Sequence, residues 1–249
     1  GKDSLIVIET LGTNVLPYLF GMKATTERIL DHIPTFKPYF PDRVLQHMGQ
    51  LFPNQLPKRI EDYSKRYDHY LQLKMEGDGI DEARAFLKEF FATEDGDYLE
   101  LDDKEAERIA THRYVTAGVA IRYEEVFQDD HIEILPLDIA LPRNEFKWFE
   151  ELPKEIEDKI QYKLYYGHFL DHVMHQDYIL KPGVDAHELK KEMLALLDKR
   201  GVIYPAEHNV GHLYEAAPAL VAHYKKNDPT NSFNPGVGKT TMHKYWGNY

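Results

Sequence analysis

The chain has 249 residues, a hydrophobic fraction of 43% and a formal net charge of -12 at pH 7. This acidic balance argues against nucleic acid as a partner, because neutralising phosphates needs a basic surface. The sequence contains no cysteine, which excludes disulfides, thiolate zinc sites and a cysteine nucleophile, so a bound metal would need nitrogen and oxygen ligands.

The first 75 residues differ in charge from the rest of the chain. They carry ten Lys/Arg against eight Asp/Glu, a net charge of +2, so the other residues carry -14. Leu5–Glu9 (LIVIE) predicts a strand at the very start, and because Gly1 is not an initiator methionine we expect a portion of a longer polypeptide. No apolar run approaches the roughly 18–20 residues that span a bilayer, so the sequence predicts a soluble or peripheral protein.

Residues 11–69 alternate Pro, aromatic and basic residues without a sustained period, which predicts short helices and irregular structure. One interpretation is a long surface excursion. The other is a membrane-surface patch, in which aromatic rings lie among the lipid headgroups and cations meet anionic lipid. The side chains of this patch would be Phe36, Tyr39, Phe40, Phe52 and Tyr63 together with Lys37, Arg43, Lys58, Arg59, Lys65 and Arg66.

From His69 onward the pattern becomes regular and predicts interleaved strands and helices. The predicted strands are Tyr70–Met75, Tyr98–Leu101, Leu135–Leu141, Tyr162–Phe169 and Val173–Ile179. The predicted helices are Asp81–Phe91, Lys104–Phe127, Glu145–Ile160 and Val184–Arg200, the last of which Gly201 ends. This order favours an α+β class, with a mostly antiparallel sheet and helices on one face.

Three histidines lie close together in YYGHFLDHVMHQD. If two strands join at this point, His168 and His175 face each other across the turn and can share one ion, and His172 lies at the turn. Histidines at this spacing are also common as structural residues, so both interpretations stay open.

A second cluster, YPAEHNVGHLY, sets Glu207 beside His208 in a loop after the last predicted helix. Two imidazoles and a carboxylate form a familiar divalent-metal set, beside which His208 could act as a base. A surface loop with capping roles is the equal alternative.

Two further motifs place polar groups in loops. In DIALPRN, Arg143 follows a strand and a proline and is either simply exposed or a clamp for a substrate carboxylate. The tail NDPTNSFNPGVGKT lacks the first glycine of a nucleotide-binding loop, since Phe233 occupies that position, so we reject an ATP site. Its backbone amides could approach another ligand closely.

Together these motifs resemble a known family. GHFLDHVMH is similar to the GHxGDGNxH signature of flavin-linked D-2-hydroxy-acid dehydrogenases, and AEHNVGH and DIALPRN resemble two of their other motifs. YYGHF, HQDYI, YPAEHNVGHLY and DPTNSFNPGVGKT, with LGT, LFP and LPKR near the start, resemble the C-terminal half of the bacterial quinone-dependent, respiratory D-lactate dehydrogenases. Two loops differ from the wider family: residues 170–173 read LDHV in place of GDGN, and Asn209 replaces a glycine.

The resemblance implies a vanillyl-alcohol-oxidase-type flavoenzyme that oxidises D-lactate to pyruvate and passes electrons to quinone. It implies a peripheral protein on the cytoplasmic side of the cell inner membrane, which meets an anionic surface through the basic/aromatic segment 23–74. Residues 1–68 would be an irregular/helical membrane-binding segment, residues 69–200 the substrate or cap domain, and residues 201–249 a strip that packs on an FAD domain absent from this chain.

The resemblance also implies roles for particular residues. His208 would be the catalytic base and Arg143 would bind the substrate carboxylate. A divalent metal, Zn or Mn, would be held by His168, His175 and Glu207, and the residues near FAD would be Asn234, Pro235, Gly236 and Lys239. The rival hypotheses are a membrane- or metal-binding module without redox activity and a related D-2-hydroxy-acid dehydrogenase.

Overall fold

The computed structural model describes residues 2–11, 40–48, 51, 56–206 and 215–247. The chain forms two compact units, and each is considered by itself. The first unit contains residues 1–134, 158–164 and 178–184, and the second contains residues 135–157, 165–177 and 185–249.

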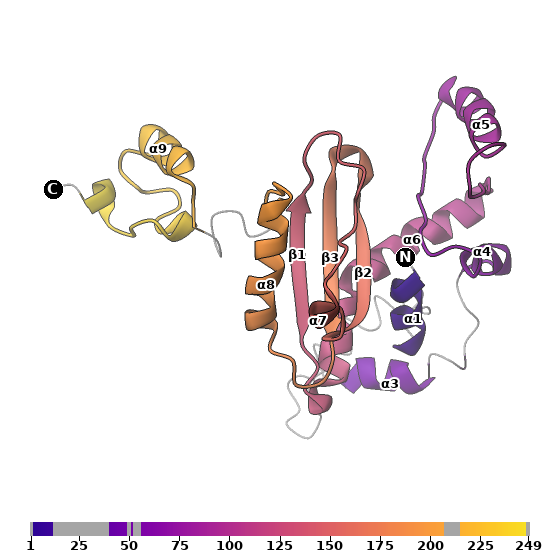
Figure 1. Cartoon of the computed structure of the whole chain (residues 1–249), viewed down its shortest axis with the longest axis horizontal. Helices are drawn as coiled ribbons and strands as arrows, with labels where there is room; N and C mark the ends of the chain where they lie inside the picture. The colour runs from indigo at the N-terminus through magenta and orange to yellow at the C-terminus, as the bar shows by residue number, and fades with distance from the viewer. Residues whose placement is uncertain (1, 12–39, 49–50, 52–55, 207–214, 248–249) are drawn as a thin grey trace. The chain divides into compact units, whose positions relative to one another are not determined.

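The first unit is mainly helical (Figure 1). Its elements are α1 (Lys2–Thr10), α3 (Phe40–Met48), α4 (Lys58–Ser64), α5 (Gly79–Phe90), α6 (Asp103–Val126) and the 3-10 turn η3 (Gln128–Asp130). Helix α6 begins with a capping box, in which Asp102 accepts from the Glu105 backbone and the Glu105 side chain accepts from the Asp102 backbone. The core of this unit lies where α1 packs on α6. Its buried residues are Val7, Ile8, Leu11, Val115, Val119, Ala120, Tyr123, Val126, Ile132, Leu164 and Ile179.

The sheet has three strands in the order β1-β3-β2 (Figure 1), namely β1 (Ile134–Ala140), β2 (Ile160–His168) and β3 (Val173–Leu180). Its register is antiparallel: Leu141 donates to the His172 carbonyl at one end of the β1-β3 pair, and Leu180 donates to the Glu133 carbonyl at the other. The 3-10 turn η4 (Phe169–Asp171) joins β2 to β3.

The second unit adds the helices α7 (Lys154–Glu157), α8 (Ala186–Lys199) and α9 (Pro218–Asn227), and the 3-10 turns η5 (Val237–Lys239) and η6 (Lys244–Gly247). Asp185 caps α8 by accepting from the Glu188 backbone. Leu189, Met193 and Leu197 recur every four residues and form its buried stripe. The helix ends before Gly201, whose φ of 68° lies in the left-handed region.

The α+β prediction is confirmed, as are the predicted strands Leu135–Leu141, Tyr162–Phe169 and Val173–Ile179 to within two residues. The predicted helices Asp81–Phe91, Lys104–Phe127 and Val184–Arg200 are also found. No helix among the described residues is long and apolar enough to cross a membrane.

Four element predictions are wrong. Leu5–Glu9 lies in α1 and not in a strand, because Val7, Ile8 and Leu11 form one buried helical face against α6. Tyr70–Met75 and Tyr98–Leu101 are extended but belong to no strand, and most of their side chains are exposed. The predicted helix Glu145–Ile160 shrinks to α7, which starts only after Pro153.

Candidate active site

One end of the sheet brings together two segments that carry candidate residues. The loop after β1 carries Arg143, and the β2–β3 hairpin carries His168 as the last residue of β2 and His172 at the turn. The backbone hydrogen bond of 2.9 Å from Leu141 to His172 ties the loop to the turn. All of these residues belong to the second unit.

His168 and His175 face each other, as the sequence predicts. Their ring centroids lie 5.8 Å apart and the rings are nearly perpendicular, at 80°. His172 occupies the turn in a left-handed conformation, with φ of 56°. The hairpin therefore pairs two of the three predicted metal ligands.

Asp138 of β1 contacts His175, with 3.1 Å between its Oδ1 and the His175 Nδ1. Both side chains are only 14% exposed. A carboxylate beside one ring nitrogen is a common partner of an imidazole whose other nitrogen binds a ligand. The pair therefore orients His175 for a ligand or a substrate proton.

Tyr166 and Asp177 extend this polar cluster along the same sheet face, since they lie two residues from His168 and His175 respectively. The Tyr166 hydroxyl donates to Asp177 Oδ2 at 2.6 Å. Burial raises the pKa of Asp177 to about 6, opposed by this hydrogen bond. Burial and the Asp177 charge likewise raise the pKa of Tyr166, so its hydroxyl stays a donor.

Sequence reasoning missed Asp138, Tyr166 and Asp177. A signal existed for two of them, because residues at i and i±2 on a strand share a face with the predicted histidines. Asp138 was quoted within DIALPRN, yet only the pairing of β1 with β3 places it beside His175.

Arg143 is exposed in the loop after β1, and the next residue, Asn144, takes a left-handed φ of 68°. Within the described part of the chain, Arg143 has no ion pair. Its guanidinium fork can therefore receive a carboxylate without first breaking such a pair.

Glu207 and His208 lie outside the described residues. The chain before them runs antiparallel to β1: Ile203 forms a bridge with Ala140, and the Ala206 amide donates to the Asp138 carbonyl at 3.0 Å. Ala206, the residue before Glu207, is therefore hydrogen-bonded to Asp138.

A complete metal-ligand set is not described. Among the residues that the structure does describe, no group of three or more His, Asp or Glu side chains is arranged to hold an ion. Two facing imidazoles, one of them oriented by a carboxylate, fit two positions of a nitrogen/oxygen coordination sphere. The third predicted ligand, Glu207, is not among the described residues.

The predicted FAD-side residues lie in a loop with internal support. The loop exposes Asn234, Pro235 and Lys239, while Gly236 is half-buried with φ of 83°. Asn231, 2% exposed, donates to the Thr241 and His243 carbonyls.

Two more contacts hold this loop. Asp228 accepts from the Ser232 and Phe233 amides, at 2.7 and 2.9 Å. Gly238 packs so closely on Ala216 that a Cβ there would lie 2.3 Å from the Ala216 Cβ. The loop thus presents its exposed residues from a fixed base; their proximity to FAD stays a prediction.

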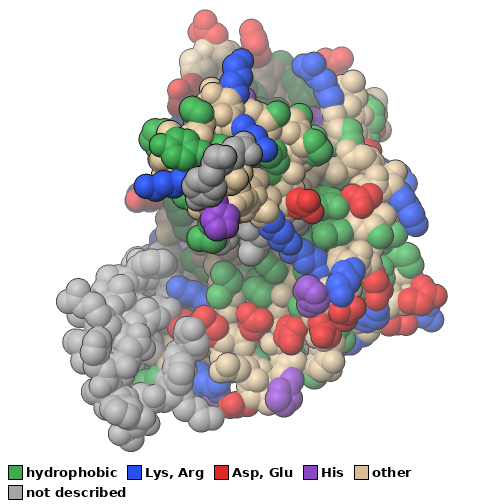
Figure 2. All heavy atoms as spheres, turned by 90° about the vertical axis from the view of Figure 1, so that its left-hand side faces the viewer, with side chains coloured by type: hydrophobic (Ala, Val, Ile, Leu, Met, Phe, Trp, Pro, Cys, Tyr) green, Lys and Arg blue, Asp and Glu red, His purple; other side chains and the backbone are tan. Residues whose placement is uncertain are grey.

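Charges of the predicted membrane patch are partly engaged within the first unit. Arg59 binds the Glu105 carboxylate, Lys65 pairs with Glu61, and Arg66 pairs with Asp97. These cations keep 52–64% of their side-chain surface exposed. The anionic partners lower the local positive charge without covering it. Four members of the predicted patch lie outside the described residues, namely Phe36, Lys37, Tyr39 and Phe52. On the face of the molecule shown in Figure 2, Lys/Arg and Asp/Glu side chains both occur.

The fold and this site define an α+β domain whose sheet end gathers histidine, carboxylate and arginine side chains. The family model of D-lactate dehydrogenase, membrane binding, matches residues 1–246, so the chain belongs to that family.

Curated relatives agree with this family. The chain is 49% identical over 246 residues to a quinone-dependent D-lactate dehydrogenase of Escherichia coli and 49% identical over 247 residues to one of Haemophilus influenzae. It is 38% identical over 248 residues to one of Corynebacterium glutamicum. Each match covers 99% of this chain but only 43–44% of the relative.

Proposed function

We propose that this chain is the cap and membrane-binding part of a peripheral flavoenzyme that oxidises D-lactate to pyruvate and passes the electrons to quinone. The observation that carries the proposal is the convergence of Arg143, the histidine hairpin and the chain before Glu207 on one sheet end. The names of the relatives supply the substrate, D-lactate, and the acceptor, quinone.

In this proposal each residue has a defined task. Arg143 binds the lactate carboxylate through its bidentate fork. His208 would take the proton of the C2 hydroxyl, and FAD would supply the acceptor for the C2 hydride. His175, held by Asp138, points Nε2 toward the hydroxyl oxygen or an ion bound to it.

Two groups would complete the site. FAD, bound mainly outside this chain with Asn234, Pro235, Gly236 and Lys239 alongside, supplies the hydride acceptor. A divalent ion held by His168, His175 and Glu207 would lower the pKa of the substrate hydroxyl. Residues 69–200 would act as the cap domain, and residues 201–249 as the strip that packs on the FAD domain.

Membrane attachment would come from residues 1–68, and the anionic membrane surface would be met through the basic/aromatic segment 23–74. Arg59, Lys65 and Arg66 hold their carboxylate partners in exposed pairs, which are individually weak, so anionic lipid can compete for these cations. Neutralising Lys58, Arg59, Lys65 and Arg66 should weaken binding to anionic vesicles, most clearly at low salt. Unchanged partitioning would remove the anionic-surface role.

The test is rapid-reaction kinetics of the intact parent enzyme with His208→Ala and Arg143→Ala. His208→Ala should lower the rate of flavin reduction at saturating D-lactate, because it removes the base. Arg143→Ala should mainly raise the D-lactate concentration needed for half-maximal reduction. Parent-like behaviour of both variants would refute the assigned roles, and a parent without flavin would favour the non-redox binding module.

A further inference from the structure

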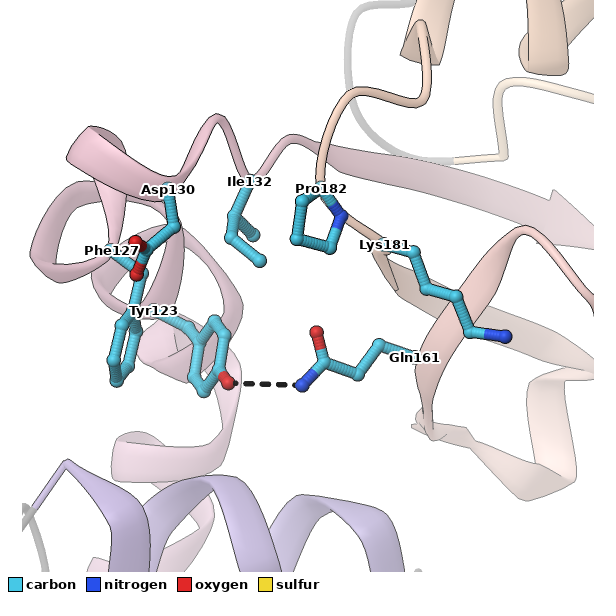
Figure 3. Close-up of a pocket in the computed structure, with 7 residues that line it drawn as sticks. All are labelled: Tyr123, Phe127, Asp130, Ile132, Gln161, Lys181 and Pro182. Atoms are coloured by element: carbon cyan, nitrogen blue, oxygen red, sulfur yellow. Dashed lines mark hydrogen bonds between the residues drawn. The ribbon is translucent and has the colours of Figure 1, made fainter.

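A cleft in the first unit has a lining suited to a flat, partly polar ring. It is a shallow hollow, open to solvent, of about 630 Å³, and it is lined by Tyr123, Phe127, Asp130, Ile132, Gln161, Lys181 and Pro182 (Figure 3). This volume lies in the range of small-ligand sites. All seven residues belong to the first unit, whereas the residues of the candidate active site belong to the second.

The walls combine aromatic surface with hydrogen-bond donors. Tyr123 and Phe127 come from the end of α6, with ring centroids 4.5 Å apart, and Gln161 of β2 lies opposite them (Figure 3). Gln161 Nε2 donates to the Tyr123 hydroxyl at 3.3 Å, and a phenol that accepts one bond can still donate its own proton. Burial raises the pKa of Tyr123, so this donor persists at neutral pH.

Lys181 contributes its backbone and the base of its side chain to the lining, while its Nζ points away from the two rings (Figure 3) and donates to the Asp158 carbonyl at 2.7 Å. The donors that face the rings are therefore the Gln161 amide and the Tyr123 hydroxyl. Donors around an aromatic floor match a ring with carbonyl oxygens at its edge, and they would stabilise the negative charge that such oxygens gain on reduction.

The cleft lies beside the membrane segment. Arg122, next to Tyr123, pairs with Asp42 of α3 at 3.6 Å, and Asp129, next to Asp130, pairs with Arg43 of α3 at 3.6 Å. Asp42 is only 3% exposed, so α3 is anchored at this turn. Helix α3 belongs to segment 23–74, so a lipid-soluble ligand held by the membrane would reach this cleft directly.

We propose that this cleft binds the head group of the quinone acceptor. The proposal rests on the proposed function, in which D-lactate plus quinone gives pyruvate plus quinol. Lactate supplies two electrons, through the flavin, and two protons, and the quinone accepts both pairs. Tyr123 and Gln161 donate to the quinone oxygens, and Phe127, Ile132 and Pro182 contact the ring.

The test uses the intact parent enzyme on phosphatidylglycerol vesicles, with a one-isoprene benzoquinone as acceptor. Gln161→Trp should fill the cleft and raise the KM for this quinone at least tenfold, while anaerobic flavin reduction by D-lactate keeps its rate. Gln161→Leu and Tyr123→Phe, which each remove one donor, should raise that KM by a smaller factor. Gln128→Trp, an exposed neighbour outside the lining, is the matched control and should leave it unchanged.

Photolabelling gives a second measurement, independent of turnover. An azido-benzoquinone should label peptides within residues 115–134 or 160–183, and unlabelled quinone and Gln161→Trp should each reduce this labelling. Labelling confined to other peptides, or an unchanged quinone KM in a folded Gln161→Trp enzyme, overturns the cleft assignment. Failure of D-lactate to reduce the flavin would instead overturn the proposed function, and the labelling would still decide whether quinone binds here.

Discussion

Two buried carboxylates of the second unit and two exposed ion pairs of the first unit are held in different ways. In the second unit the carboxylates of Asp177 and Glu150 are 8% and 7% exposed and are met by the Tyr166 hydroxyl and by Arg200. In the first unit the pairs Arg66–Asp97 and Arg84–Glu100 keep between 44% and 59% of each side chain exposed. Buried partners fix geometry and shift pKa values, whereas exposed partners leave their charges available to another ligand.

Breaking a buried pair should give the largest effect. Arg200 donates to Glu150, which also accepts from Gln176 at 3.2 Å. Arg200→Met leaves the Glu150 carboxylate without its cation and should lower the free energy of unfolding by about 3–5 kcal/mol. Urea unfolding measures this loss. The control Lys147→Met breaks an exposed pair with Glu151 and should lower the free energy of unfolding far less. Equal losses in the two variants would contradict the difference between buried and exposed pairs.

A half-buried histidine gives the first unit a pH dependence. Burial lowers the pKa of His112 from 6.5 to about 4, so the folded state favours neutral imidazole and loses stability as the pH falls through this window. Between pH 7 and 4.5 the parent should lose about 2–3 kcal/mol relative to His112→Leu. Unfolding curves at several pH values test this, with His187→Leu at an exposed position as the control. A difference between parent and His112→Leu that stays constant with pH would show that His112 is not the cause.

Weakening the orientation of His175 should have an intermediate effect. Asp138→Asn removes the carboxylate at Nδ1 and should lower kcat/KM for D-lactate by about 10–100-fold. The nitrogen-15 shifts of His175 should move toward the Nε2–H tautomer. Asp171→Asn, in the exposed hairpin turn, is the control, and an Asp138→Asn enzyme matching this control in both readouts would deny Asp138 an orienting role.

The smallest effect should come from a single surface cation. Lys58 is exposed at the start of α4. Lys58→Ala should weaken partitioning onto anionic vesicles by about fivefold at low salt, and less at high salt. Lys191→Ala in the second unit should leave partitioning unchanged; equal losses in both variants would indicate general electrostatics and not a patch.

Most strands and helices of the second unit could be predicted from local periodicity. The alternation in LPLDIAL and the four-residue spacing of Leu189, Met193 and Leu197 each identify one element without tertiary information. The hairpin follows from the strands that flank His168 and His175, and its two histidines indeed meet.

Elements decided by tertiary packing could not be predicted in this way. A five-residue apolar run such as LIVIE suits a strand or a buried helix face, and only the surface of α6 selects the helix. The cleft gathers Tyr123, Gln161 and Lys181 from three distant stretches, so no local pattern signals it. The contact between Asp138 and His175 depends on the pairing of two strands, so no local pattern signals it either.

The central claim, that this chain serves D-lactate oxidation by a flavin, is tested most directly by visible absorbance. The intact parent polypeptide is purified and mixed without oxygen with D-lactate or, separately, L-lactate. Bleaching of a flavin band by the D isomer alone is the predicted result. A flavin that neither isomer bleaches, or a parent polypeptide with no flavin band, would contradict the account.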